Sequence, residues 1–202
     1  MLSSITPLGE RGRAGRWGIT VTAYMLGSAS GGAAVGGLAG AVGWLLPLER
    51  SGAATAALVL VALVAAVAVL VEIGVLPRLP TVRRQVDEDW LHRYRGWVYG
   101  AGFGFQLGAG LVTIVTSPTV YLTGVLAVLT GSPSRGAAVG LAFGLTRALP
   151  VLLARRVTTT AGLAATSRRL VALEPAGRAT AAAGLAAVAA AGVAQLVLAG
   201  GA

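Results

Sequence analysis

Residues 52–76 read GAATAALVLVALVAAVAVLVEIGVL, and this stretch decides the class of fold. Glu72 is its one charged residue, and the rest is mainly Ala, Val and Leu. A helix needs about 20 consecutive apolar residues to cross the hydrocarbon core of a bilayer. The segment therefore predicts a transmembrane helix that ends before Pro77.

The composition of the whole chain agrees with a membrane environment. Of the 202 residues, 55% are hydrophobic and 11% are charged, and the mean hydropathy is +0.79. An average soluble domain has about 25% charged residues, so this chain has too few charges to cover a water-exposed surface. The net charge of +9 lies in short loops between apolar runs, without interleaved aromatic residues, which argues against nucleic-acid binding.

Four other apolar runs accompany residues 52–76. They cover residues 17–46, 97–131, 136–154 and 179–198. Together the runs predict an all-α integral membrane protein with five transmembrane helices in a single transmembrane domain over residues 1–202. The run 97–131 would make a helix about 50 Å long, too long for one upright span. We expect a break near Pro118, because proline interrupts the helical hydrogen-bond ladder.

The arginines predict the orientation of these spans. Cytoplasmic loops of membrane proteins carry an excess of positive charge. If the amino terminus is cytoplasmic, so are the loops 78–95 and 155–178, and only Arg50, Arg135 and Arg147 of the 16 basic residues fall elsewhere. An odd number of spans then leaves the carboxyl terminus outside. In the loop 78–95, acidic residues ahead of aromatic ones predict a short surface helix.

Glycines recur at every fourth position in three of the spans. They are Gly32, Gly36 and Gly40, then Gly104 and Gly108, then Gly136, Gly140 and Gly144. Small residues at this spacing allow helices to approach closely in lipid. We interpret them as packing positions, and a pore lined by glycine backbone is the alternative.

Two ionisable residues lie inside apolar runs, Glu72 in the second and Arg147 in the fourth. Charges within a membrane are costly and usually face a partner or a water-filled cavity. We hypothesise that they form an intramembrane ion pair, or that Arg147 holds an anionic solute. In the alternative interpretation, Glu72 extends its carboxylate to the membrane surface.

Uncharged polar residues concentrate around Pro118, and this is the candidate substrate-binding site. Its predicted members are Gln106, Thr116, Ser117, Pro118, Thr119, Tyr121 and Arg147, with Thr113 in the same segment. A broken helix frees backbone groups that bind a solute at membrane depth. Alternatively, the hydroxyl groups bond to carbonyls one turn earlier and soften a kink.

The residues supply no case for a catalytic or metal site. Cysteine is absent, which excludes disulfides, thiolate ligands and thiol redox chemistry by this chain alone. His92 has no second histidine or cysteine to share a metal, and the acidic residues Asp87, Glu88 and Asp89 suit a helix start. We therefore expect no cofactor, no metal and no catalytic residue.

Three stretches of sequence resemble the CcdA/DsbD-type transmembrane family. They are residues 1–13 (MLSSITPLGERGR), the segment from Gly104 through Ser117-Pro118-Thr119 to Pro133, and residues 140–153 (GLAFGLTRALPVLL). The resemblance implies six helices in two inverted three-helix repeats that carry thiol electrons for cytochrome c maturation, with Pro-Cys in each repeat. Here Thr119 stands where the second cysteine would be, and the chain begins just after the place of the first. We therefore expect a degenerate inverted repeat without its first helix.

These observations lead to three functional hypotheses. The first is a small-solute transporter or permease-like subunit of the bacterial inner membrane, with an unidentified substrate. The alternative is a non-catalytic membrane subunit that scaffolds a redox or cytochrome c assembly complex. The third is an electron carrier whose true start lies upstream of Met1. As partners we expect the lipid bilayer and either a second copy of the chain or another membrane subunit that completes the helical bundle.

Overall fold

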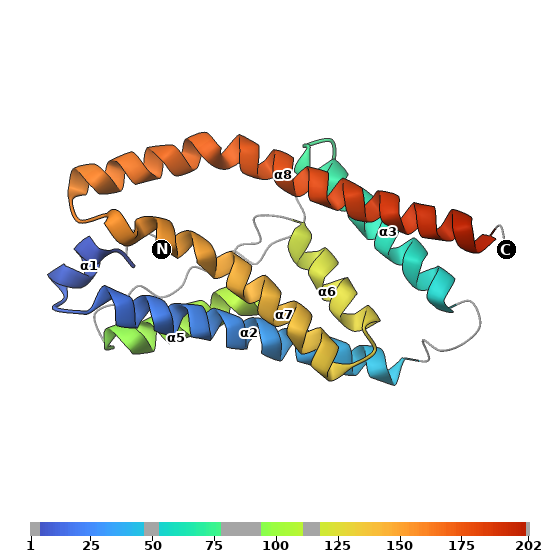
Figure 1. Cartoon of the computed structure of the whole chain (residues 1–202), viewed down its shortest axis with the longest axis horizontal. Coiled ribbons are helices and arrows are strands. Elements are labelled where there is room, and N and C mark those ends of the chain that lie inside the picture. The colour runs from blue at the N-terminus through green and yellow to red at the C-terminus, as the bar shows by residue number, and fades with distance from the viewer. Residues whose placement is uncertain (1–4, 47–52, 78–93, 111–117, 201–202) are drawn as a thin grey trace. The chain divides into compact units, whose positions relative to one another are not determined.

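The computed structural model describes residues 5–46, 53–77, 94–110 and 118–200, and these parts contain helices and no strands (Figure 1). In chain order the elements are α1 (Pro7–Gly12), α2 (Trp17–Leu45), α3 (Ala53–Glu72), α5 (Gly96–Ala109), α6 (Thr119–Leu129), α7 (Pro133–Ala148), the 3-10 helix η1 (Leu149–Arg156) and α8 (Thr160–Gly200). The all-α prediction is confirmed.

Four helical segments of the described chain are long and apolar enough to cross a membrane. They are Trp17–Leu45, Ala54–Glu72, Pro133–Arg156 and Thr160–Leu198, and Thr119–Leu129 is a shorter apolar helix. The third predicted span is divided between α5 and α6, which have 14 and 11 residues. At 1.5 Å per residue they are about 21 and 17 Å long, so each is shorter than the roughly 30 Å hydrocarbon core.

The predicted break of the third span is confirmed. The first helix of the pair ends earlier in the chain than expected. Helix α5 ends at Ala109, and Gly110 follows in the left-handed conformation with φ +70°. Glycine adopts this conformation without steric cost and commonly ends helices in this way. Pro118 is the N-cap of α6. Thr113, Thr116 and Ser117 lie outside the described residues.

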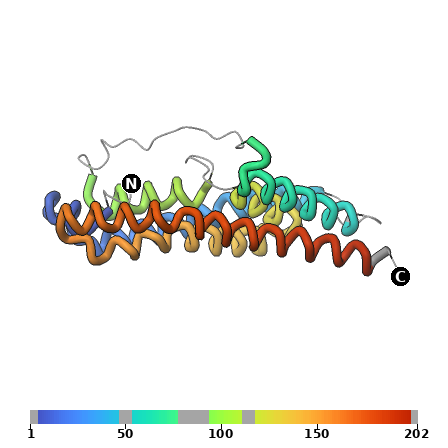
Figure 2. Tube along the Cα trace, turned by 90° about the horizontal axis from the view of Figure 1, so that it is seen from above, coloured from blue at the N-terminus to red at the C-terminus, as the bar shows by residue number. Residues whose placement is uncertain are grey.

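The predicted loop at residues 155–178 is wrong from Thr160 onward, because α8 begins there and continues through Pro175 as one helix (Figure 2). Four charged residues and a proline suggested a loop. However, Ala, Leu, Arg and Glu are all strong helix formers, and their summed propensity outweighs one internal proline. The surface helix predicted within residues 78–95 falls largely outside the described residues.

The chain divides into two compact units. Unit 1 comprises Met1–Val35, Val82–Ile114 and Gly140–Leu173, and unit 2 comprises Gly36–Thr81, Val115–Val139 and Glu174–Ala202. Buried side chains of unit 1 form a cluster of Ile5, Val21, Tyr24, Tyr99, Phe103, Ala148 and Val151. In unit 2 the buried cluster is Ala65, Ala68, Leu122 and Leu185. The single transmembrane domain proposed for the whole chain stays a prediction.

Backbone contacts between helices confirm the packing role of the repeated glycines. In unit 1, an added Cβ on Gly108 would lie 2.6 Å from the Ser28 carbonyl carbon, and one on Gly144 would lie 2.9 Å from the same atom. In unit 2, an added Cβ on Gly136 would lie 2.9 Å from the Gly40 Cα atom. Helix α2 therefore packs so closely against α5 and α7 that the glycine positions have no room for a larger side chain.

Candidate functional site

Helix α1 is a short element that holds the chain ahead of the first long span. Thr6 is its N-cap, and the Thr6 hydroxyl accepts a hydrogen bond of 3.0 Å from the Gly9 amide. Pro7 occupies the first helical turn, where its missing N–H costs nothing. The Leu8 amide donates to the Val157 carbonyl at 3.1 Å, which ties α1 to the end of η1.

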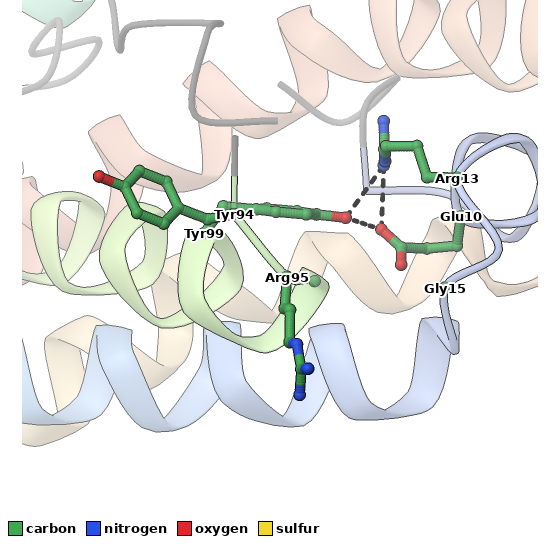
Figure 3. A pocket seen from close by; sticks show the side chains of 7 residues that line it. Glu10, Arg13, Gly15, Tyr94, Arg95 and Tyr99 are labelled. Atoms are coloured by element: carbon green, nitrogen blue, oxygen red, sulfur yellow. Dashed lines mark hydrogen bonds and ion pairs between the residues drawn. The ribbon is translucent and has the colours of Figure 1, made fainter. Parts of the chain in front are cut away.

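The carboxylate of Glu10 is the centre of a buried polar network in unit 1. The Arg13 guanidinium donates to Glu10 Oε1 at 2.9 Å, and the Tyr99 hydroxyl donates to the same oxygen. The Thr20 hydroxyl donates to Glu10 Oε2 at 3.0 Å. Figure 3 shows Arg13 and Tyr99 converging on Glu10. Because Glu10 is only 1% exposed, these donors and the positive charge of Arg13 replace the water that burial removes.

The network forms one wall of an open cavity of about 300 Å³. The cavity is lined by Glu10, Arg13, Gly15, Tyr94, Arg95, Gly96 and Tyr99. Helix α5 begins at this wall, and its N-cap residue Arg95 makes no side-chain capping hydrogen bond. The Arg95 side chain points away from the Glu10 carboxylate (Figure 3). The cavity therefore has one neutralised ion pair and one further guanidinium in its lining.

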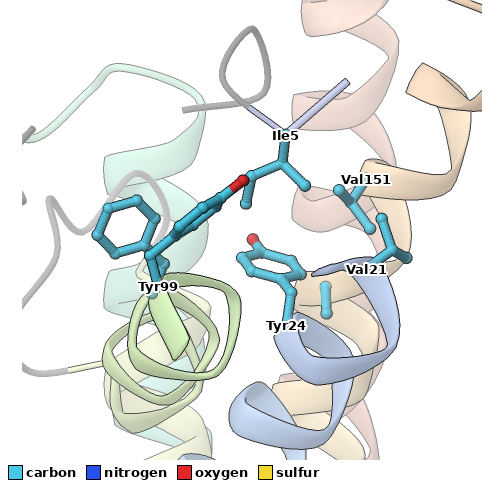
Figure 4. Close-up of a cluster of buried hydrophobic side chains, with 7 residues drawn as sticks. Ile5, Val21, Tyr24, Tyr99 and Val151 are labelled. Atoms are coloured by element: carbon cyan, nitrogen blue, oxygen red, sulfur yellow. The ribbon is translucent and has the colours of Figure 1, made fainter. Parts of the chain in front are cut away.

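Tyr99 connects the polar network to the apolar core of unit 1. Its ring is 5.9 Å from the Phe103 ring between centroids, and its neighbours in the cluster include Ile5 and Tyr24 (Figure 4). Tyr99 is 1% exposed and Ile5 is 2% exposed. The Trp17 indole donates to the Ile5 carbonyl at 3.3 Å, which holds the incoming chain against α2. The hydroxyl of Tyr99 is thus positioned by packing as well as by hydrogen bonds.

This network was not predicted from the sequence, although one signal for it is present there. Glu10 is the only acidic residue before Glu49, and it lies between a Thr-Pro helix start and Arg11. An isolated acid among arginines suggests an ion pair, but Tyr99 and Thr20 are too distant in sequence to be predicted as its partners. The Glu10 carboxylate and the side chains around it are bonded to one another, an arrangement that stabilises the fold of unit 1.

The predicted substrate-binding residues fall in both units. Within unit 1, Gln106 is half-buried. Arg147 donates a hydrogen bond of 3.0 Å to the carbonyl of Leu107, the residue after Gln106. The Arg147 guanidinium also lies 5.4 Å from the centre of the Phe143 ring. Leu107 is in the last turn of α5, where a cation is favourable because helix carbonyls lack partners there. Arg147 thereby stabilises the end of the broken helix.

Within unit 2, Pro118 and Tyr121 line an apolar cavity of about 190 Å³. Its other walls are the aliphatic side chains Leu63, Val64, Val67 and Ala68 of α3. The Thr119 carbonyl accepts a hydrogen bond of 2.9 Å from the Thr123 hydroxyl, an i−4 bond of the kind that softens helices. Thr116 and Ser117 lie outside the described residues, and the proposed solute site as a whole stays a prediction.

Glu72 lies at the end of α3 beside a second arginine from α8. Arg178 Nε is 3.8 Å from Glu72 Oε1, and an Arg178 Nη donates to the Glu72 carbonyl. Glu72 is 7% exposed. One guanidinium thus binds both the side chain and the last carbonyl of α3. The hypothesised pair of Glu72 with Arg147 joins residues of different units and stays a prediction.

Apolar helices, a span interrupted at Gly110 and glycine-mediated packing define a multi-pass helical membrane protein. Residues 3–197 match the family model described as cytochrome C biogenesis protein transmembrane region. The match covers nearly the whole chain, and the protein belongs to this family. The resemblance found in the sequence is thereby confirmed.

The chain is similar to methylamine utilization proteins named MauF. It is 34% identical to that of Methylophilus methylotrophus over 157 residues, which are 74% of this chain and 53% of the relative. The identity to the protein of Paracoccus versutus is 35% over 154 residues, 74% of this chain and 55% of that relative. The chain thus spans about half the length of these curated relatives. No solved structure matches the chain.

Proposed function

We propose that the protein is a non-catalytic membrane subunit that supports the assembly of a redox or cytochrome c complex in the bacterial inner membrane. One observation carries the proposal. The chain belongs to a family of cytochrome c biogenesis transmembrane regions, yet none of its 202 residues is cysteine. Thiol electron transfer requires a thiolate, so this chain by itself has no group to carry the electrons. A supporting role in assembly keeps the fold without needing the relay.

The relatives suggest the process that this assembly serves. Their names assign them to methylamine utilization. We extend this assignment to the present chain and infer that the complex is used during growth on methylamine or a related small amine. A partner membrane subunit, or a second copy of the chain, would complete the helical bundle.

The order of helices supports the degenerate inverted repeat as part of this proposal. Helix α1 follows Thr6 and starts with Pro7, and a long glycine-containing span, α2, comes next. Helix α6 follows Pro118, and the glycine-containing span α7 comes next. We place the amino terminus in the cytoplasm and the carboxyl terminus outside, as the arginine distribution predicts.

The contacts of the described residues favour assembly over transport. Pro118 and Tyr121 face an aliphatic cavity, which offers a polar solute few partners. Arg147 is engaged by the Leu107 carbonyl. Arg147 thus has a structural role at the end of α5 that needs no bound solute.

A deletion strain of the source bacterium separates the two functions. We expect the strain to lose haem-stained c-type cytochromes or its methylamine-grown redox complex, and plasmids encoding the wild type, Gln106→Ala or Thr119→Ala to restore them equally. Proteoliposomes containing the purified protein should not accumulate labelled methylamine. Uptake of methylamine that is abolished by Gln106→Ala or Thr119→Ala would show a transporter instead.

A further inference from the structure

The open cavity beside Glu10 lies where the apolar helices of unit 1 begin. Its lining residue Gly15 precedes the start of α2 at Trp17, and its lining residue Gly96 is the first residue of α5. Val157, the residue after η1, accepts a hydrogen bond from the Leu8 amide of α1, the helix that carries Glu10. Helices that span a membrane start and end at the level of the lipid headgroups. The cavity therefore belongs to the water–lipid boundary.

Aromatic side chains mark the same level. Tyr94 lines the cavity and is 46% exposed, and Trp97, in the first turn of α5, is 54% exposed. Trp and Tyr concentrate at membrane interfaces, because their rings are apolar and their polar atoms bond to water and headgroups. Two exposed aromatic residues beside one open cavity are the arrangement expected at headgroup depth.

The described residues around the cavity have a net positive charge. Among its lining residues, Glu10 and Arg13 cancel, which leaves Arg95 with a charge of +1. The carboxylate of Glu10 is already bonded at both oxygens and is 1% exposed, so it scarcely repels a ligand. Arg11, Arg16 and Arg156 are exposed on the adjoining ends of α1, α2 and η1. Glu10 is also the only acid among the described residues of unit 1.

The cavity has the size and donors of an anion site. Its volume of about 300 Å³ is at the lower end of ligand sites in proteins. Arg95 is exposed, and its guanidinium group is not bonded to a described residue. Guanidinium groups bind phosphate oxygens with two parallel hydrogen bonds. At headgroup depth, acidic phospholipids present a phosphate together with a net negative charge.

From this geometry we propose that the cavity between α1 and the start of α5 binds the headgroup phosphate of an anionic phospholipid through Arg95, with Tyr94 against the lipid. The bound lipid fixes the depth at which unit 1 lies in the membrane. Inorganic phosphate shares this chemistry without the acyl chains. This site is independent of the assembly role proposed above.

The test is a titration of the purified full-length protein in dodecyl maltoside. Bound lipid is counted by native mass spectrometry for phosphatidylglycerol and for phosphatidylcholine with the same acyl chains, and inorganic phosphate is added as a competitor. We expect about tenfold tighter binding of phosphatidylglycerol, because phosphatidylcholine carries the same phosphate next to a cationic choline that offsets its negative charge. Arg95→Gln should abolish this preference, while Arg156→Gln, at the end of η1 and outside the cavity lining, should retain it.

Three results would overturn the proposal. Equal binding of the two lipids would exclude recognition of an acidic lipid by its net negative charge, and equal losses in Arg95→Gln and Arg156→Gln would exclude the cavity. Complete competition by inorganic phosphate at concentrations similar to those of the lipid would assign the site to a soluble anion. If Arg95→Gln does not purify as a monodisperse protein, Arg95→Lys serves in its place, and it should keep part of the preference because it keeps the charge without the planar fork.

Discussion

The close packing of α2 against α5 predicts that Gly108→Ala destabilises the protein. An added methyl carbon at Gly108 would lie 2.6 Å from the Ser28 carbonyl carbon and 2.8 Å from the Ser28 Cα atom. Carbon atoms pack at about 3.5–4.0 Å, so the two helices would have to separate by roughly 0.9 Å or more. Separation is resisted along the whole contact, since Gly104 meets the Tyr24 and Ser28 backbone one turn away.

The magnitude follows from two opposing terms. Overpacking typically costs about 1–3 kcal/mol, and the better helix propensity of alanine returns about 1 kcal/mol. Gly124→Ala in α6 is the matched control, because an added Cβ there has nothing within 4 Å. It should gain up to about 1 kcal/mol from propensity alone. We therefore expect the free energies of unfolding of the two variants to differ by about 1–3 kcal/mol.

Unfolding of both variants and the wild type is followed by circular dichroism in one detergent, as a function of temperature and of added denaturant. Gly108→Ala should unfold first and Gly124→Ala last. The reasoning about close helix packing fails if Gly108→Ala is as stable as Gly124→Ala. A loss of stability in both variants would show that the glycines act through something other than contact distance.

Two further predictions concern buried charges. Glu10→Ala should lower the free energy of unfolding by about 3–5 kcal/mol, because it leaves Arg13 without its carboxylate. The control is Glu174→Ala, at an exposed position in α8, which should change the free energy of unfolding by less than about 0.5 kcal/mol in the same assay. Equal small effects would mean that the Glu10 network does not stabilise the fold. Arg178→Gln should lower the unfolding temperature, because Glu72 loses its ion pair. The double variant with Glu72→Gln should recover part of that loss. Additive losses in the double variant would refute the interaction between Glu72 and Arg178.

Much of the fold was predictable from the chain because a bilayer imposes simple requirements. A run such as residues 52–76 must form a helix, since its backbone groups have no water to bond with in the hydrocarbon core. The break in the third span followed from its length, and the glycine repeats predicted close packing. Helix α8 was predicted only in its second half, because Pro175 and the neighbouring charges resemble a loop when they are read locally.

The candidate site was less predictable than the fold. Glu10 accepts hydrogen bonds from Tyr99, 89 residues away, and Glu72 is bonded to Arg178, 106 residues away. Hydropathy and residue spacing contain no information about such partners. Hydropathy showed only that Glu72 is a charge inside an apolar segment and therefore needs a partner.

The sequence by itself determined that this is a helical membrane protein, that it has apolar segments long enough to cross a bilayer, and that the chain contains no cysteine. These properties depend on composition and on the length of apolar runs, which are local. Only the tertiary structure decided which buried charges pair, that α1 folds into unit 1, and that Arg95 stands at an open cavity. These depend on distances between residues far apart in the chain, because a buried charge is stabilised by whichever donor the packing of helices brings to it.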